Sequence, residues 1–301
     1  MRYEKKYTKR PSYLTPNKTR KVEGEQAMKR VALVHNQKDL SVEYAEKFKR
    51  SLSAYGLVLT QDRDQVDYVV SIGGDGTLLS AFHQFQSHLD QVQFLGIHTG
   101  HLGFYTDWLV EDLPELLSGL KDHQAESIAY PLLDVKVFMT NGQVEHKLAL
   151  NECSIRSHRK TMVCDVEISG QFFETFRGDG LCVATPTGST GLNKSLGGAV
   201  IHPRVEAMQM TEMASVNNRV YRTLASPIIL PKDEWLNLRP EVDNEWLDLT
   251  VDHLFWADQA IDHIRLQLAD QKIKFANFRH MHYWDRVESA FIASQTSKDC
   301  Q

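Results

Sequence analysis

The stretch SIGGDGT, residues 71–77, constrains the fold of this chain most strongly, because its glycines lie where a strand gives way to a helix. It follows the apolar run at residues 68–70 and precedes a helical pattern over about residues 78–89. Glycines at such a turn let the backbone approach a ligand closely, and the N–H groups that begin a helix attract anions such as phosphate. An aspartate has the wrong charge for holding phosphate. Asp75 is therefore a general base, a metal ligand, or merely a helix N-cap or turn residue.

The pattern around this turn alternates between strand and helix. An apolar run at residues 31–34 precedes residues at helical spacing up to Gly56, and short apolar runs follow at residues 57–59 and 94–97. This βαβαβ order predicts a doubly wound, mostly parallel α/β sheet at residues 28–129. Ligands of such sheets bind outside the carboxyl ends of the strands, which is where the glycine turn lies.

Beyond a helical stretch at residues 113–120, the pattern changes to an alternation with period two, which indicates antiparallel strands with one face exposed to water. We expect a β-rich, sandwich-like domain at residues 130–273. A C-terminal segment, residues 274–301, then returns to the first domain through a helix from Tyr283 to Gln295. The alternating runs are residues 162–168, 247–251 and 264–268.

Charge and composition exclude several classes of protein. The first 27 residues hold eight basic and three acidic residues with hardly any apolar ones, so we expect a disordered tail there. The whole chain has a formal net charge of −5, which argues against nucleic acid or an acidic membrane as its partner. No run approaches the ~20 apolar residues of a membrane span. The four cysteines lack the spacing of a zinc site, so we expect reduced thiols in a cytoplasmic protein.

Two further motifs carry groups that suit a nucleotide. Residues 178–203, GDGLCVATPTGSTGLNKSLGGAVIHP, interleave small hydroxyl residues with glycines, which is compatible with binding ribose and phosphate or with a plain polar loop. Asn151 and Glu152 end another apolar run, and this amide and carboxylate could grip a vicinal diol. His98 and His101 are three residues apart without a third ligand nearby, so we expect no metal site there.

Taken in order, these motifs resemble the bacterial NAD kinase family over roughly residues 29–295. The resemblance is carried by GGDGT at 73–77, HTGHLGF at 98–104, NE at 151–152, RGDG at 177–180, the TPTGST run and VDH at 251–253. GGDGT alone is weak, because diacylglycerol kinases, sphingosine kinases and phosphofructokinases carry similar motifs. A lipid kinase would need an apolar substrate cavity, and a dehydrogenase would need GxGxxG after a strand; neither pattern is found here.

The resemblance implies transfer of the γ-phosphoryl group of ATP to the 2′-hydroxyl of the adenosine ribose of NAD, which gives NADP. Asp75 would accept the proton of that hydroxyl. Mg²⁺ would arrive with ATP rather than at a dedicated protein site, and the chain would form a homodimer or homotetramer with residues shared between subunits. The binding residues implied are Gly73, Gly74, Gly76, Thr77, Phe104, Asn151, Glu152, Arg177, Asp179, Thr190, Gly191, Leu192, Asn193, Lys194, Ser195, Ala214, Tyr221 and His253.

Two positions need separate comment. Relatives usually read Thr-Ala-Tyr-Asn where this chain reads Thr190-Gly191-Leu192-Asn193, so a ring that could stack on a base is replaced by an aliphatic side chain. By alternation His253 shares a face with Leu249 and Val251, which predicts a core histidine. Only the resemblance makes His253 a site residue.

Overall fold

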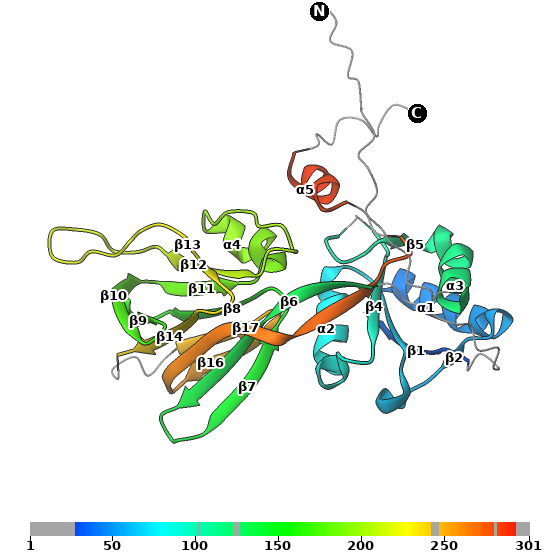
Figure 1. The fold of residues 1–301 in the computed structure, drawn as a ribbon, viewed down its shortest axis with the longest axis horizontal. Helices are drawn as coiled ribbons and strands as arrows, with labels where there is room; N and C mark the ends of the chain where they lie inside the picture. The colour runs from blue at the N-terminus through cyan, green and yellow to red at the C-terminus, as the bar shows by residue number, and fades with distance from the viewer. Residues whose placement is uncertain (1–27, 101–102, 123–126, 242–246, 280–281, 293–301) are drawn as a thin grey trace, which may run out of the picture.

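A computed structural model describes residues 28–100, 103–122, 127–241, 247–279 and 282–292. The predicted tail at residues 1–27, His101 and residues 293–295 of the predicted last helix lie outside the described residues. The molecule has two lobes joined by long strands, with a short C-terminal helix above the junction (Figure 1).

The first lobe is the predicted doubly wound sheet. Its parallel strands lie in the order β2, β1, β3, β4, and β5 pairs with β4. Helix α2 covers one face through Leu78 and Phe82, whereas α1 and α3 cover the other through Phe48 and Leu117. The elements are β1 (Arg30–His35), α1 (Asp39–Leu52), β2 (Val58–Leu59), β3 (Tyr68–Ile72), α2 (Asp75–Phe85), β4 (Gln93–His98), β5 (Trp108–Leu109) and α3 (Leu113–Asp122).

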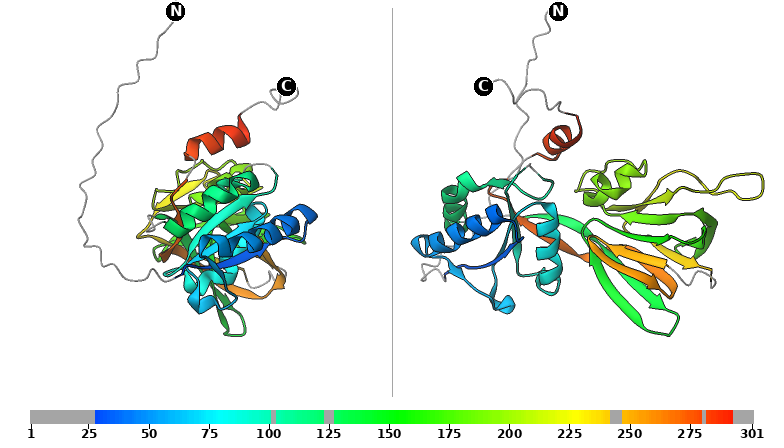
Figure 2. Two further views of the ribbon diagram at one scale, coloured as in Figure 1. Left: turned by 90° about the vertical axis from the view of Figure 1, so that its right-hand side faces the viewer. Right: turned by 180° about the vertical axis from the view of Figure 1, so that it is seen from behind.

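The second lobe packs two antiparallel arrays face to face, as the period-two alternation predicts (Figure 2). One array has the order β13, β12, β11, β8, β15, β16, and the other contains β10, β9, β14, β17, β6 and β7. Val166 and Ile264 from one array meet Ile155 and Leu249 from the other in a shared apolar core. The strands are β6 (Ser127–Met139), β7 (Val144–Ala149), β8 (Glu152–Ser157), β9 (Met162–Ile168), β10 (Gln171–Gly178), β11 (Gly180–Ala184), β12 (Ala207–Met213), β13 (Ile228–Pro231), β14 (Trp235–Pro240), β15 (Leu247–Val251), β16 (Leu254–Gln259) and β17 (Ile261–Ala276).

Strand β17 connects the lobes. It pairs with β6 and β14 in the second lobe, and near its end Phe275 pairs in parallel with Phe94 of β4. One sheet therefore continues from the first lobe into the second. The domain boundaries at residues 129/130 and 273/274 stay predictions, since β6 and β17 run across them.

Helices are few in the second half of the described chain. Helix α4 (Leu192–Ser195) follows a 3₁₀ turn at Thr187–Thr190, and α5 (Tyr283–Phe291) is the C-terminal helix. Short 3₁₀ turns also occur at Ser53–Tyr55, Arg63–Gln65, Gln86–His88 and Val110–Asp112. Helix α5 contacts the first lobe, because Arg286 donates to the carbonyl of Gly103 at 2.9 Å. This confirms the predicted return of the chain to that lobe.

Two local predictions are wrong. Helix α2 begins at Asp75 rather than near Leu78, because Gly74 serves as its N-cap. Strand β15 has no fully exposed face: Thr250 is half-buried, and Asp248 is buried, where its carboxylate accepts the N–H of Asp258 at 3.1 Å and pairs with His158.

Candidate active site

The glycine turn lies at the carboxyl end of β3. Gly73 has φ +153°, and a Cβ there would lie 2.2 Å from Thr77 Oγ1, so only glycine fits. Its N–H donates to the carbonyl of Ile97 at the end of β4, at 2.9 Å. Gly74 and Gly76 are exposed, with nothing within 4 Å of a Cβ at either position. The turn therefore leaves an open backbone surface at the start of α2, of the kind that binds phosphate.

Asp75 is held by the loop that follows β4. Its carboxylate accepts the N–H of Phe104 at 2.9 Å and the N–H of Tyr105 at 3.0 Å. A Cβ on Gly103 would lie 2.2 Å from Asp75 Oδ1, so this close approach requires glycine. The N-cap interpretation of Asp75 is wrong, since the side chain binds another loop. Each carboxylate oxygen keeps a lone pair for a substrate hydroxyl.

Asn151 and Glu152 form the turn between β7 and β8, beside Asp75. The hydroxyl of Tyr105 donates to Asn151 Oδ1, which links the two loops. Among the described residues, Glu152 Oε2 is buried without a hydrogen-bond partner. Burial and the charge of Asp252 raise the pKa of Glu152 to about 8, an effect that Arg156 partly offsets. A buried acceptor without a partner suits a ligand that brings donors, such as ribose hydroxyls.

Part of the polar groups in the hydroxyl-rich stretch, residues 178–203, hydrogen-bond to the protein's own backbone. Thr185 Oγ1 donates to the carbonyl of Leu150 at 2.6 Å, and Ser189 Oγ donates to that of Pro186 at 2.6 Å. The Asn193 amide is buried and donates to the carbonyl of Ser189 at 3.3 Å. Of the other predicted residues, Thr190 and Leu192 are half-buried, and Gly191, Lys194 and Ser195 are exposed.

His253 is not a core histidine. Strand β15 ends at Val251, Asp252 turns the chain with φ +55°, and His253 is exposed. Its Nε2 lies 3.3 Å from Ser80 Oγ on α2. The alternation prediction fails because the strand ends two residues too early for it. Burial and the neighbouring His83 lower the pKa of His253, while Asp252 partly opposes them.

Four predicted residues form a second group, away from Asp75. Arg177 and Asp179 flank the start of β11, whereas the Asn151 turn meets its other end, about 13 Å away at ~3.3 Å per residue. The Arg177 guanidinium lies 4.3 Å from the centre of the Tyr221 ring. Ala214 has φ +46° at the start of the same exposed loop.

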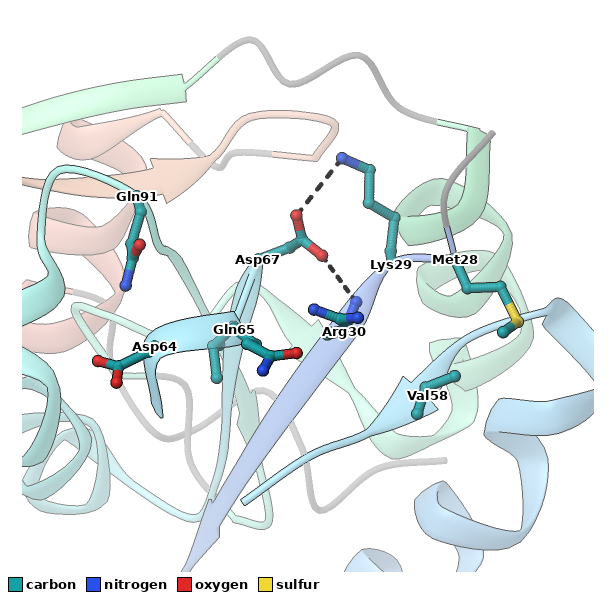
Figure 3. Close-up of a pocket in the computed structure, with 9 residues that line it drawn as sticks. Met28, Lys29, Arg30, Val58, Asp64, Gln65, Asp67 and Gln91 are labelled. Atoms are coloured by element: carbon teal, nitrogen blue, oxygen red, sulfur yellow. Dashed lines mark hydrogen bonds and ion pairs between the residues drawn. The ribbon is translucent and has the colours of Figure 1, made fainter. Parts of the chain in front are cut away.

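A cavity of about 510 Å³ lies away from this site and opens at the amino ends of β1 and β3. Figure 3 shows Asp67 there between Lys29, at 3.7 Å, and the backbone N–H of Arg30, at 2.7 Å. Because parallel sheets bind ligands at the opposite edge, we assign this cavity no part in the site.

Several polar residues of the site carry no signal of their own in the sequence. Tyr105, Ser80 and His83 lie inside or beside apolar or helical runs, and Asp252 stands out only as a member of the VDH motif. The nearest usable signal is position: Tyr105 follows the HTGHLGF motif, and Ser80 and His83 follow Asp75 on α2. Their contacts cross between the lobes, which local patterns do not report.

Two general properties complete the description. Within the described residues no three His, Cys, Asp or Glu side chains are grouped so that they could hold a metal ion. In the same part of the chain, no helix has the length and apolar character needed to cross a membrane.

The fold and this site define a two-domain phosphotransferase that acts on a hydroxyl group. Residues 4–125 match the family model of the ATP-NAD kinase N-terminal domain, and residues 150–278 match the family model of the ATP-NAD kinase C-terminal domain. The chain belongs to the ATP-NAD kinase family, and its reaction is phosphoryl transfer from ATP to NAD.

Relatives and solved structures agree with this assignment. An NAD kinase of Latilactobacillus sakei is 50% identical over 267 residues, which cover 88% of this chain and 98% of the relative. One of Geobacillus stearothermophilus is 48% identical, over 85% of this chain and 93% of the relative. The fold is similar to that of yeast NADH kinase, with a TM-score of 0.77 at 19% identity over 91% and 90% of the two chains. It is also similar to an Archaeoglobus fulgidus NAD kinase, with a TM-score of 0.69 at 22% identity over 86% and 99%.

Proposed function

We propose that Asp75 is the base that accepts the proton of the 2′-hydroxyl of the adenosine ribose of NAD while the γ-phosphoryl group of ATP is transferred to that oxygen. The observation that carries this proposal is the fixed carboxylate of Asp75 at the first residue of α2, among glycines and beside the Asn151 turn. Phosphoryl transfer needs mainly positioning and charge stabilisation, so one base and a glycine-rich backbone cradle suffice.

The amides of Phe104 and Tyr105 hold the carboxylate of Asp75 in place for the substrate hydroxyl. A carboxylate is a weak base, so it accepts the proton late. By then the attacking oxygen is losing charge to phosphorus. We expect the carboxylate to orient the hydroxyl first and to take its proton at the end of the step.

Asn151 and Glu152 would bind the dinucleotide through its ribose hydroxyls. Glu152 Oε2 is buried and without a protein partner among the described residues, and the Asn151 side chain is fixed by Tyr105. Phe104, half-buried beside the ring of Tyr283, offers an aromatic face to a base. Thr190 to Ser195 and His253 would complete the walls of this pocket.

A divalent cation accompanies the ATP of such kinases, and we infer that it is Mg²⁺. Mg²⁺ commonly keeps substrate phosphates and water as most of its ligands, and we expect no dedicated protein site for it. The cation then belongs to the ATP substrate, where phosphate oxygens hold it. The protein's own contribution is the position of the nucleotide and of Asp75.

The second group, at Arg177, Asp179, Ala214 and Tyr221, fits a site shared between subunits. Within one chain it lies one strand length from the Asn151 turn, and we propose that a second copy brings it to the dinucleotide. The loop that carries it is rich in exposed apolar side chains, including Val220 at 78% and Leu224 at 47% exposure. We therefore expect a homodimer or homotetramer.

The buried thiols of Cys153, Cys164 and Cys182 form no disulfide and suit a reducing compartment, which supports a cytoplasmic enzyme.

The activity itself is tested by incubating the chain with NAD, ATP and Mg²⁺ and measuring NADP with an NADP-specific dehydrogenase. We expect NADP to form, and no phosphorylation of diacylglycerol or sphingosine under the same conditions. Absence of NADP would refute the proposal.

A further inference from the structure

The carboxylate of Asp252 accepts four hydrogen bonds at the junction of the lobes. It lies in the turn between β15 and β16, and the residue is 8% exposed. Oδ1 accepts the N–H of Asn151 at 2.7 Å and that of Glu152 at 3.3 Å. Oδ2 accepts the N–H of Leu150 at 3.0 Å. Three successive backbone amides of one turn therefore converge on one carboxylate.

The same carboxylate reaches the helix that carries the base. His83 Nε2 on α2 donates to Asp252 Oδ2 at 2.8 Å, and the His83 side chain is 10% exposed. Asp75 is the first residue of that helix, and His83 follows it by about two turns at 3.6 residues per turn. Asp252 thus hydrogen-bonds both to the Asn151–Glu152 turn and to α2, the helix that begins at Asp75.

The backbone of Asp252 is specialised for this place. Its φ of +55° is left-handed, a conformation that aspartate tolerates better than most residues. Its own N–H donates to the carbonyl of Glu152 at 2.9 Å, so both the main chain and the side chain of Asp252 hydrogen-bond to the Asn151–Glu152 turn. Hydrogen bonds to a carboxylate are roughly twice as strong as those between neutral groups, and here they are shielded from water.

We propose that Asp252 is a positioning residue for the phosphoryl transfer: it holds the Asn151–Glu152 turn against helix α2, which fixes the separation between the bound dinucleotide and Asp75. The inference rests on the proposed roles of Asp75, Asn151 and Glu152. Asp252 itself is enclosed by the amides and by His83 and acts only through the groups it holds.

The first test compares two buried aspartates of neighbouring positions. Asp252→Asn replaces one acceptor oxygen with an NH₂ group that faces backbone donors, so the turn must shift. Because a misplacement of about 1 Å costs about 10²-fold, we expect kcat/KM for NAD to fall by about 10²-fold. The control is Asp248→Asn in β15, whose carboxylate is also buried but accepts the N–H of Asp258 instead. We expect the control to keep a kcat/KM close to that of the wild type, because the Asp248 carboxylate bonds to Asp258 and His158 rather than to the Asn151 turn or α2.

A double-mutant cycle separates positioning from general damage. If Asp252 acts through Asn151, the combined variant Asp252→Asn/Asn151→Ala loses far less activity than the product of the two single losses. Losses that simply multiply would overturn the inference. So would a wild-type kcat/KM in Asp252→Asn.

A second pair of variants tests the link to α2 even if Asp252→Asn fails to fold. His83→Leu removes the donor, whereas His83→Gln places an amide N–H close to the position of Nε2. We expect His83→Leu to lower kcat about tenfold with little change in KM for NAD, and His83→Gln to restore most of it. Equal activities in the two variants would contradict the link. An inactive wild type would instead refute the proposed function, so the two failures are distinguishable.

Discussion

Asp75 and Glu152 are both carboxylates near the junction of the lobes, yet their surroundings differ. Asp75 accepts two backbone N–H bonds, which hold its carboxylate in one orientation. Burial of Glu152, whose Oε2 has no partner among the described residues, and the nearby charge of Asp252 raise its pKa and favour its protonated form. We therefore expect Asp75 to engage the reacting hydroxyl and Glu152 to bind a neutral diol.

The raised pKa of Glu152 makes stability depend on pH. The folded chain keeps this proton up to about pH 8, whereas the unfolded chain loses it near the ordinary value of 4.5. Between these limits the folded state binds more protons, so the free energy of unfolding contributed by this group falls as pH rises. Below pH 4.5 the contribution is fully present, and it is lost as pH passes through about 8.

Glu152→Gln removes this titration. We expect urea unfolding at pH 5, 6.5 and 8 to show a smaller decline of stability with pH in the variant than in the wild type. Glu145→Gln serves as the control, because Glu145 pairs with Lys147 on the surface. Identical slopes in the wild type and Glu152→Gln would contradict the assigned protonation.

Helix α5 acts on the site as an element rather than through one contact. Arg286, 3% exposed, donates to the carbonyls of Gly103 at 2.9 Å and Thr106 at 3.3 Å and pairs with Asp107. It thereby holds the loop whose amides bind Asp75. Helix α5 also meets the second lobe, where the Tyr283 hydroxyl donates to the carbonyl of Ile201 at 3.2 Å.

Arg286→Ala is expected to affect both stability and activity. Breaking a buried ion pair costs about 3–5 kcal/mol, and the released loop no longer fixes Asp75. The control Arg279→Ala removes partly exposed pairs with Asp112 and Glu115 and should cost under about 1 kcal/mol. Urea unfolding and NADP formation at a temperature where both variants are folded provide the measurements. Equal effects of the two substitutions would contradict the role of α5.

Elements were predictable where local pattern determined them. The parallel strands, the turn before α2 and the alternating strands β9 and β17 follow from apolar spacing in the sequence. The start of α2 was missed because the preceding glycine caps it. The buried face of β15 was missed because the groups that Asp248 contacts, Asp258 and His158, are not marked by the apolar spacing. The turn at His253 was missed because β15 ends at Val251, before the alternation reaches His253. Asp75 was identified, but its loop partners were not, since glycine at 103 signals close approach without naming its target.

At the scale of the whole molecule, strand β17 makes the two lobes share one sheet. This shared sheet fixes the first lobe, which carries Asp75, relative to the second lobe, which carries the Asn151 turn. The second group at Arg177 and Asp179 remains outside that junction. This arrangement predicts that one subunit supplies Asp75 and another supplies Asp179 to the same dinucleotide.

Mixing two inactive variants tests this sharing. We expect Asp75→Asn and Asp179→Ala each to be nearly inactive, and their mixture after dissociation and reassociation to recover about a quarter of wild-type activity in a dimer. Half of the randomly formed dimers then contain both variants, and each of these has one intact site. No recovery from a mixture that exchanges subunits would place Asp179 in its own subunit's site, or outside any site.

The measurement that tests the account most directly is the steady-state kinetics of Asp75→Asn with NAD and ATP. The substitution keeps the shape of the side chain and removes its ability to accept a proton. We predict a kcat lower by about 10²- to 10⁴-fold, with KM for NAD little changed, because the hydroxyl loses its base while the binding turn stays intact. A folded Asp75→Asn variant with the kcat of the wild type would contradict the account.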